Sequence, residues 1–109
     1  MMVTEATYQM TRQFPSEERF GMVSQMRRSS LSVPSNIAEG FRRGSPKEFR
    51  KFLGIAFGSL AELETQYLVA QRLNYLNGPE LMKLFETMDH LGRMTNKLRQ
   101  RLQSSTRTI

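Results

Sequence analysis

The 109-residue chain has no cysteine, a single histidine and no long run of apolar residues. The absence of cysteine excludes disulfides, thiolate zinc sites and cysteine nucleophiles. One histidine, His90, leaves little room for histidine metal clusters or for Ser-His-Asp triads. A membrane-spanning helix needs about 20 consecutive apolar residues, and the N-terminus also lacks the pattern of a signal peptide. We therefore expect a cytoplasmic, non-enzymatic protein that uses no metal or cofactor and has no membrane or small-molecule partner.

Acidic residues are a minority, with ten Asp and Glu against sixteen Lys and Arg, and the basic excess lies in two segments. Residues 27–51 carry seven basic and two acidic side chains, whereas residues 92–109 carry five basic and no acidic ones. Such blocks are typical of nucleic-acid or other anionic partners, although basic residues also simply solvate helix faces. The candidate nucleic-acid-binding residues are Arg43, Lys47, Arg50 and Lys51 around one turn, and Arg93, Lys97 and Arg101 in a stripe with no acid to neutralise it.

Strand signals are weak because alternation is absent and β-branched residues are few, whereas helix boundaries are well marked. Ser45-Pro46 is a strong helix start, and Asn77-Gly78-Pro79 combines a stop with a restart. The sequence predicts helices at about 3–14, 17–43, 46–75 and 79–103, followed by a frayed tail at 104–109.

Apolar residues alternate in steps of three and four along the third and fourth predicted helices, the spacing of a seam that faces a neighbouring helix. The seams are Phe49, Leu53, Ala56, Leu60, Leu63, Tyr67 and Ala70, and Leu81, Leu84, Met88, Leu91, Thr95, Leu98 and Leu102. A looser stripe in the second helix consists of Phe20, Val23, Met26 and Leu31. Helices of this length with short connections pack antiparallel. The sequence therefore predicts one all-α domain over residues 1–109, an antiparallel up-down four-helix bundle with a shortened first helix.

An unusual polar stretch surrounds Pro34, where the second helix should kink or be interrupted because proline removes an amide donor. Its members are Pro34, Ser35, Asn36, Glu39 and Gly40. One interpretation is a hydrogen-bonded kink that fixes the geometry of the bundle, and the other is a polar ligand site.

The third predicted helix is apolar on every face between Phe52 and Ala61. A helix that is apolar all round is normally buried all round, which four short helices of one chain cannot achieve. The candidate oligomer interface is Gly54, Ile55, Phe57, Gly58, Ala61 and Leu68. The alternative is a locally overfilled core.

The stretch RRSSLSVPSNIAEGFRRGSPKEFRKFLGIAFGSLAELETQYLVAQRLNYL, residues 27–76, resembles the 23S ribosomal RNA intervening-sequence proteins, and Phe14-Pro15 and Glu18-Arg19-Phe20-Gly21 precede it as in that family. The resemblance continues more loosely to about residue 102. It implies a left-handed up-down bundle that assembles as a homopentameric ring. Relatives include the accessory protein of diversity-generating retroelements, a basic ring that works with a reverse transcriptase and nucleic acid. Only Met1–Gln13 precede Phe14 here, so the first helix is either truncated or begins upstream.

Three functions follow as hypotheses. The first is an oligomeric accessory or ribosomal-RNA-associated protein that binds RNA or DNA backbone without strong sequence preference. The second is a protein-interaction scaffold whose basic face meets an acidic partner. The third, an enzyme that uses Asn36 and Glu39, lacks a nucleophile, a histidine base and a metal.

Overall fold

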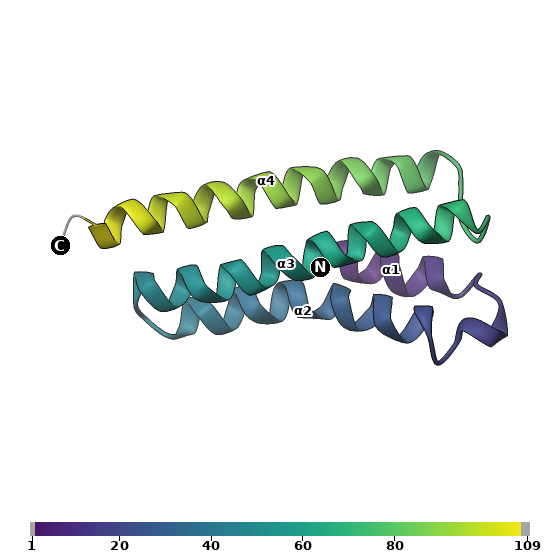
Figure 1. The fold of residues 1–109 in the computed structure, drawn as a ribbon, viewed down its shortest axis with the longest axis horizontal. Coiled ribbons are helices and arrows are strands. Elements are labelled where there is room, and N and C mark those ends of the chain that lie inside the picture. Colours follow the sequence, from purple (N-terminus) through teal and green to yellow (C-terminus); the bar gives the residue numbers. More distant parts are fainter. Residues whose placement is uncertain (1, 108–109) are drawn as a thin grey trace.

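The computed structural model describes residues 2–107, with side chains through Gln103, and this part of the chain is helical and contains no strand. The elements are α1 (Met2–Thr11), the 3-10 helix η1 (Ser16–Glu18), α2 (Met22–Arg42), α3 (Pro46–Arg72) and α4 (Pro79–Arg107). The α-helices alternate in direction, and α1 lies along only one half of the bundle (Figure 1). The predicted all-α four-helix bundle with a short first helix is confirmed.

Four predicted helix boundaries differ from the structure. α2 begins at Met22 rather than at about residue 17, because residues 16–18 form the separate 3-10 helix η1 and a turn follows it. α1 ends at Thr11, before a turn and η1, and α3 ends at Arg72 because Asn74 adopts a left-handed φ of 62°. α4 continues through Arg107, although a frayed tail was expected from residue 104. Residues 108 and 109 of that expected tail lie outside the described residues.

The start of α3 follows the sequence signal. The Ser45 Oγ atom accepts a hydrogen bond from the Glu48 amide at 3.1 Å, which satisfies one of the free amides of the first turn. Pro46 occupies the first turn, where its missing N–H costs nothing. Gly44 makes the reversal from α2 possible with a φ of 78°, a conformation that glycine tolerates best.

α2 is continuous across Pro34, so the expected interruption is absent. Pro34 has no amide hydrogen to donate to the Ser30 carbonyl one turn earlier. The Thr4 hydroxyl of α1 donates to that carbonyl instead, at 3.0 Å. The hydrogen bond that proline removes from α2 is thus replaced by one that fastens α1 to α2.

α1 is held by a chain of hydrogen bonds as well as by apolar packing. The buried Tyr67 hydroxyl donates to Thr7 Oγ1 at 2.7 Å, and Thr7 donates in turn to the Val3 carbonyl at 2.9 Å. Arg27 Nε donates to Thr11 Oγ1 at 3.0 Å, so a cation lies at the C-terminal end of α1, where the helix dipole favours it. Burial raises the pKa of Tyr67 to about 12, although the hydrogen bond with Thr7 acts in the opposite direction.

α2 and α3 approach each other closely at Gly40. A Cβ atom built on Gly40 would lie 2.6 Å from Phe52 Cβ and 3.1 Å from Phe49 Cδ1. Only glycine therefore fits at this crossing. This requirement explains why the polar stretch around Pro34 ends with a glycine at position 40.

The core confirms the predicted seam of α3 from Leu53 to Ala70, whereas its first member, Phe49, is only half-buried. The predicted seam of α4 is buried from Leu81 to Met88, but Leu98 is 36% exposed.

The stripe proposed for α2 is only half right. Val23 and Met26 are buried, whereas Phe20 is 88% exposed and Leu31 is 44% exposed. Phe20 precedes α2, in the turn that joins η1 to it, so the helical spacing used to place it in the core does not apply.

Candidate nucleic-acid interface

The first basic block surrounds the turn from α2 to α3. Arg43, Lys47 and Lys51 are exposed, and Arg50 is half-buried. The Arg43 guanidinium lies 5.0 Å and Lys51 Nζ 5.9 Å from the centroid of the Phe52 ring, so one aromatic face brings two cations together across the turn. Arg43 also forms an exposed ion pair with Glu39 at 3.0 Å, which offsets part of its charge.

The second basic block is a stripe on α4. Arg93, Lys97 and Arg101 are all exposed and recur once per turn. The expectation that no acid neutralises the stripe is wrong for Arg93, which pairs with Asp89 one turn earlier. Burial and the nearby Asp89 raise the pKa of Glu64 on the facing part of α3. Because Arg93 is paired with Asp89, Lys97 and Arg101 are the more available cations of the stripe.

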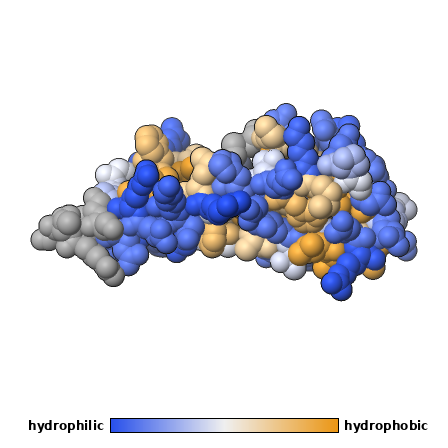
Figure 2. Space-filling model, turned by 90° about the horizontal axis from the view of Figure 1, so that it is seen from above, coloured by the Kyte–Doolittle hydropathy of each residue, from blue (hydrophilic) through white to orange (hydrophobic). Residues whose placement is uncertain are grey.

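The antiparallel arrangement brings the two basic blocks to the same end of the molecule (Figure 1). Arg99 of α4 lies against Gly54 of α3, with guanidinium atoms 3.6 Å from the position of a Cβ. The second basic block is therefore level with the first turns of α3, although some fifty residues separate the two in sequence. Lys97 and Arg101 each lie two residues from Arg99, so they project from the side of α4 that faces away from α3. Seen from the α4 side, this half of α4 is mostly hydrophilic (Figure 2).

The polar stretch around Pro34 forms contacts within the chain rather than an open site. The Asn36 amide donates to the Ser32 carbonyl at 2.8 Å and to the Ser32 hydroxyl at 2.9 Å. That hydroxyl also hydrogen-bonds to Ser59 of α3 at 2.7 Å. Ser35 is exposed, Glu39 pairs with Arg43, and Gly40 lies at the helix crossing. These contacts favour the structural interpretation of the stretch.

The outward face of α3 carries apolar side chains that the other described helices leave uncovered. Ile55 is 44%, Leu68 50% and Val69 42% exposed, and the small Gly58 and Ala61 are exposed between them. Two of the six candidate interface residues lie elsewhere. Gly54 faces Arg99, and the Phe57 ring packs beside Gly92 and 5.6 Å from the Arg99 guanidinium, so both face α4 of the same chain.

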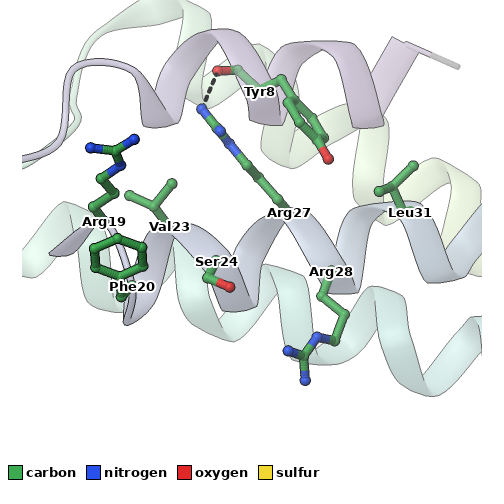
Figure 3. Close-up of a pocket in the computed structure, with 8 residues that line it drawn as sticks. All are labelled: Tyr8, Arg19, Phe20, Val23, Ser24, Arg27, Arg28 and Leu31. Atoms are coloured by element: carbon green, nitrogen blue, oxygen red, sulfur yellow. Dashed lines mark hydrogen bonds between the residues drawn. The ribbon is translucent and has the colours of Figure 1, made fainter.

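A third group of arginines lies at the opposite end of the bundle. It includes Arg27 and Arg28, which the sequence analysis counted with the first basic segment, and Arg12 and Arg19, which it did not single out. Two adjoining hollows between α1, η1 and the start of α2 share Arg19, Val23 and Arg27. Arg12 lines one of them, and Arg28 lines the other together with Phe20 (Figure 3). These residues come from the turns after α1 and η1 and from α2, and only the pairs Arg19-Phe20 and Arg27-Arg28 offered a signal in the sequence.

No helix among the described residues is both long enough and apolar enough to cross a membrane. In the same part of the chain, no three His, Asp or Glu side chains gather in a way that could hold a metal ion.

The sequence matches the family described as 23S rRNA-intervening sequence protein over residues 1–97. A search of curated proteins finds no match to the chain. The family match covers most of the chain, and the chain therefore belongs to the 23S rRNA-intervening sequence protein family.

Proposed function

We propose that this member of the family is a non-enzymatic, oligomeric protein that binds the backbone of RNA or DNA through its basic surfaces, as an accessory or ribosomal-RNA-associated protein. The observation that carries the proposal is that two basic blocks, distant in sequence, lie at the same end of the bundle. The name of the family is compatible with an association with RNA.

The recognition we propose is electrostatic. Exposed lysines and arginines neutralise phosphates and release counterions, and each phosphate contact adds to affinity without reading sequence. Lys47 and Lys51 on α3, with Lys97 and Arg101 on α4, are exposed cations without an ion pair among the described residues. Arg43, Arg50 and Arg93 complete the surface, with Arg43 and Arg93 weakened by their own carboxylate partners.

The test is a binding titration at low and physiological salt with charge-reversed variants. Lys97→Glu/Arg101→Glu and Lys47→Glu/Lys51→Glu should each weaken binding to RNA and DNA. On a duplex, the slope of log affinity against log salt should fall by about 0.9 for each phosphate that the variant no longer neutralises. Arg72→Glu/Lys83→Glu changes the net charge equally but lies outside both blocks, and it should retain most of the affinity.

Equal losses in all three double variants would mean that net charge alone drives binding and would reject the two blocks as a site. If the wild-type protein binds no nucleic acid at low salt, the scaffold with a basic face for an acidic partner replaces the proposal. An enzyme remains the weakest alternative, and its sign would be a turnover that Glu39→Gln abolishes.

The oligomer we propose is a closed ring, buried through the outward face of α3, with five copies as the number that the resemblance implies. Exposed apolar side chains can mark an interaction site, and here Ile55, Leu68 and Val69 are exposed along one helix, with the small Gly58 and Ala61 and the polar Glu62 and Thr65 exposed between them. A ring also multiplies each basic block, which strengthens binding through multivalency.

Light scattering at micromolar concentration tests the assembly. Ala61→Arg and Gly58→Arg place a charge on the face and should release monomers, whereas Gln13→Arg, an exposed change in the turn after α1, should not. A monomeric wild-type protein would reject the ring.

A further inference from the structure

The two adjoining hollows at the α1–α2 end, which we name the arginine hollow, are lined by arginines and by no carboxylate. Their volumes are about 490 and 290 Å³, and together they are lined by Arg12, Arg19, Arg27 and Arg28. Binding pockets for small organic groups span roughly 300–1,000 Å³, so the larger hollow has room for a nucleotide. The arrangement favours an anionic occupant.

The four arginines differ in how far they are engaged. Arg27 is fixed by its bonds to Thr11 Oγ1 and, at 3.3 Å, to the Tyr8 carbonyl, and its guanidinium lies 4.6 Å from the Tyr8 ring centroid (Figure 3). Arg12, Arg19 and Arg28 are exposed and form no ion pair with any described residue. One arginine therefore shapes the hollow, and three are free to contact an anion.

Phe20 supplies an aromatic surface beside the arginines of the hollow. It is 88% exposed at the edge of the hollow, and the Arg19 guanidinium lies 5.4 Å from its ring centroid (Figure 3). An aromatic ring at that exposure gains nothing from the core of its own chain. A flat face beside unpaired arginines is the combination on which single-stranded nucleic acids bind, a base stacking on the ring and its phosphates lying against the cations.

We infer that the arginine hollow binds single-stranded nucleic acid, with one unstacked base on Phe20 and the adjoining phosphates on Arg19 and Arg28. A duplex keeps its bases stacked on one another and cannot offer one to Phe20. The hollow should therefore give the protein a preference for single strands. This inference rests on the proposed function, since it adds a site to a protein that binds nucleic acid.

The experiment compares labelled RNA and DNA strands of about a dozen nucleotides, without self-complementarity, with their own duplexes. The wild-type protein should bind the single strands more tightly than the duplexes. Phe20→Ala should weaken single-strand binding by about tenfold and leave duplex binding nearly unchanged, and Phe20→Trp should restore the preference. A strand that contains 2-aminopurine should change its fluorescence on binding to the wild-type protein and much less with Phe20→Ala.

Phe41→Ala is the matched control. Phe41 is also exposed, at 74%, but it lies beside the first basic block and packs against Phe49 at 5.9 Å between ring centroids. It should leave the single-strand preference intact, whereas Arg19→Glu/Arg28→Glu should reduce it. Equal effects of Phe20→Ala and Phe41→Ala would overturn the assignment to the hollow, and so would an unchanged ratio of single-strand to duplex affinity in Phe20→Ala.

The outcomes also separate this inference from the proposed function. If the wild-type protein binds single strands and duplexes equally and Lys97→Glu/Arg101→Glu weakens both, the arginine hollow fails and the basic blocks stand. If no nucleic acid binds, both fail. If Phe20→Ala lowers the molecular mass by light scattering, a second copy of the chain covers the hollow and the inference is overturned.

Discussion

Replacing Gly40 by alanine should destabilise the protein, although alanine is the better helix former by about 1 kcal/mol. The new Cβ would lie 2.6 Å from Phe52 Cβ, 3.1 Å from Phe49 Cδ1 and 3.3 Å from the Phe49 carbonyl oxygen. Carbon atoms pack at about 3.5–4.0 Å, so α2 and α3 must separate by roughly 1 Å at this point. Phe52 Cβ cannot swing away because it is fixed to the backbone of α3. Overpacking of this kind costs about 1–3 kcal/mol, and after the gain in helix propensity a net loss of up to about 2 kcal/mol remains.

Gly54→Ala is the matched control, since Gly54 is also a glycine inside a helix. Its added Cβ meets only the flexible Arg99 side chain, at 3.6–3.7 Å, which is ordinary contact. This variant should therefore gain up to about 1 kcal/mol from helix propensity. Urea unfolding followed by helical circular dichroism measures both, at one protein concentration because assembly would add to stability. The reasoning is refuted if Gly40→Ala unfolds at the same or a higher urea concentration than Gly54→Ala.

Two further predictions concern the attachment of α1. The pKa of Tyr67 is about 12 in the folded protein against an ordinary value of 10.0. The neutral hydroxyl therefore makes its full contribution to the free energy of unfolding below pH 10, and about 2–3 kcal/mol of that contribution is lost as pH rises from 10 to 12. Urea unfolding should show that the free energy of unfolding of the wild-type protein falls between pH 10 and 12, and that it falls less in Tyr67→Phe. An equal fall in the two proteins would contradict the prediction. Thr4→Val should cost about 1–2 kcal/mol because it leaves the Ser30 carbonyl without a donor. Adding Pro34→Ala, which restores an amide to that carbonyl, should recover most of the loss in a double-mutant cycle, and purely additive effects would show that the Thr4 bond is not the replacement.

The helices were predictable because their signals are local. Ser45-Pro46 starts α3 as expected, and the seam from Leu53 to Ala70 is buried as its spacing predicts. The continuity of α2 was not predictable, because it depends on Thr4, a residue 26 positions before the carbonyl that it satisfies. A local rule for proline cannot include a donor that another helix supplies.

The candidate site was predictable to a smaller extent for the same reason. The two basic blocks are visible in the sequence, but their position at the same end of the bundle follows from helix direction and from the contact of Arg99 with Gly54. The ion pair of Arg93 with Asp89 was available from spacing alone, since the two residues are four apart in one helix. The arginine hollow draws on α1, the turn after η1 and α2, and no single pattern joins those segments.

Two groups of residues depart from the usual pattern of apolar residues inside and polar residues outside, namely buried hydroxyls and exposed apolar side chains. The difference between the two groups indicates where functional surfaces lie. The buried hydroxyls make hydrogen bonds to carbonyls three or four residues back in their own helices, so they need no further partner. They are Thr7, Thr11, Ser29, Ser30 and Thr95. The exposed apolar residues cannot be satisfied in this way, because only another surface removes them from water. Phe20 lies beside unpaired arginines, whereas Ile55 lies in the uncharged stretch of residues 52–61 and Leu68 in a second uncharged stretch, residues 65–71, with Glu62 and Glu64 between the two. The charge beside each apolar residue therefore favours a nucleic acid for the first and a second copy of the chain for the others.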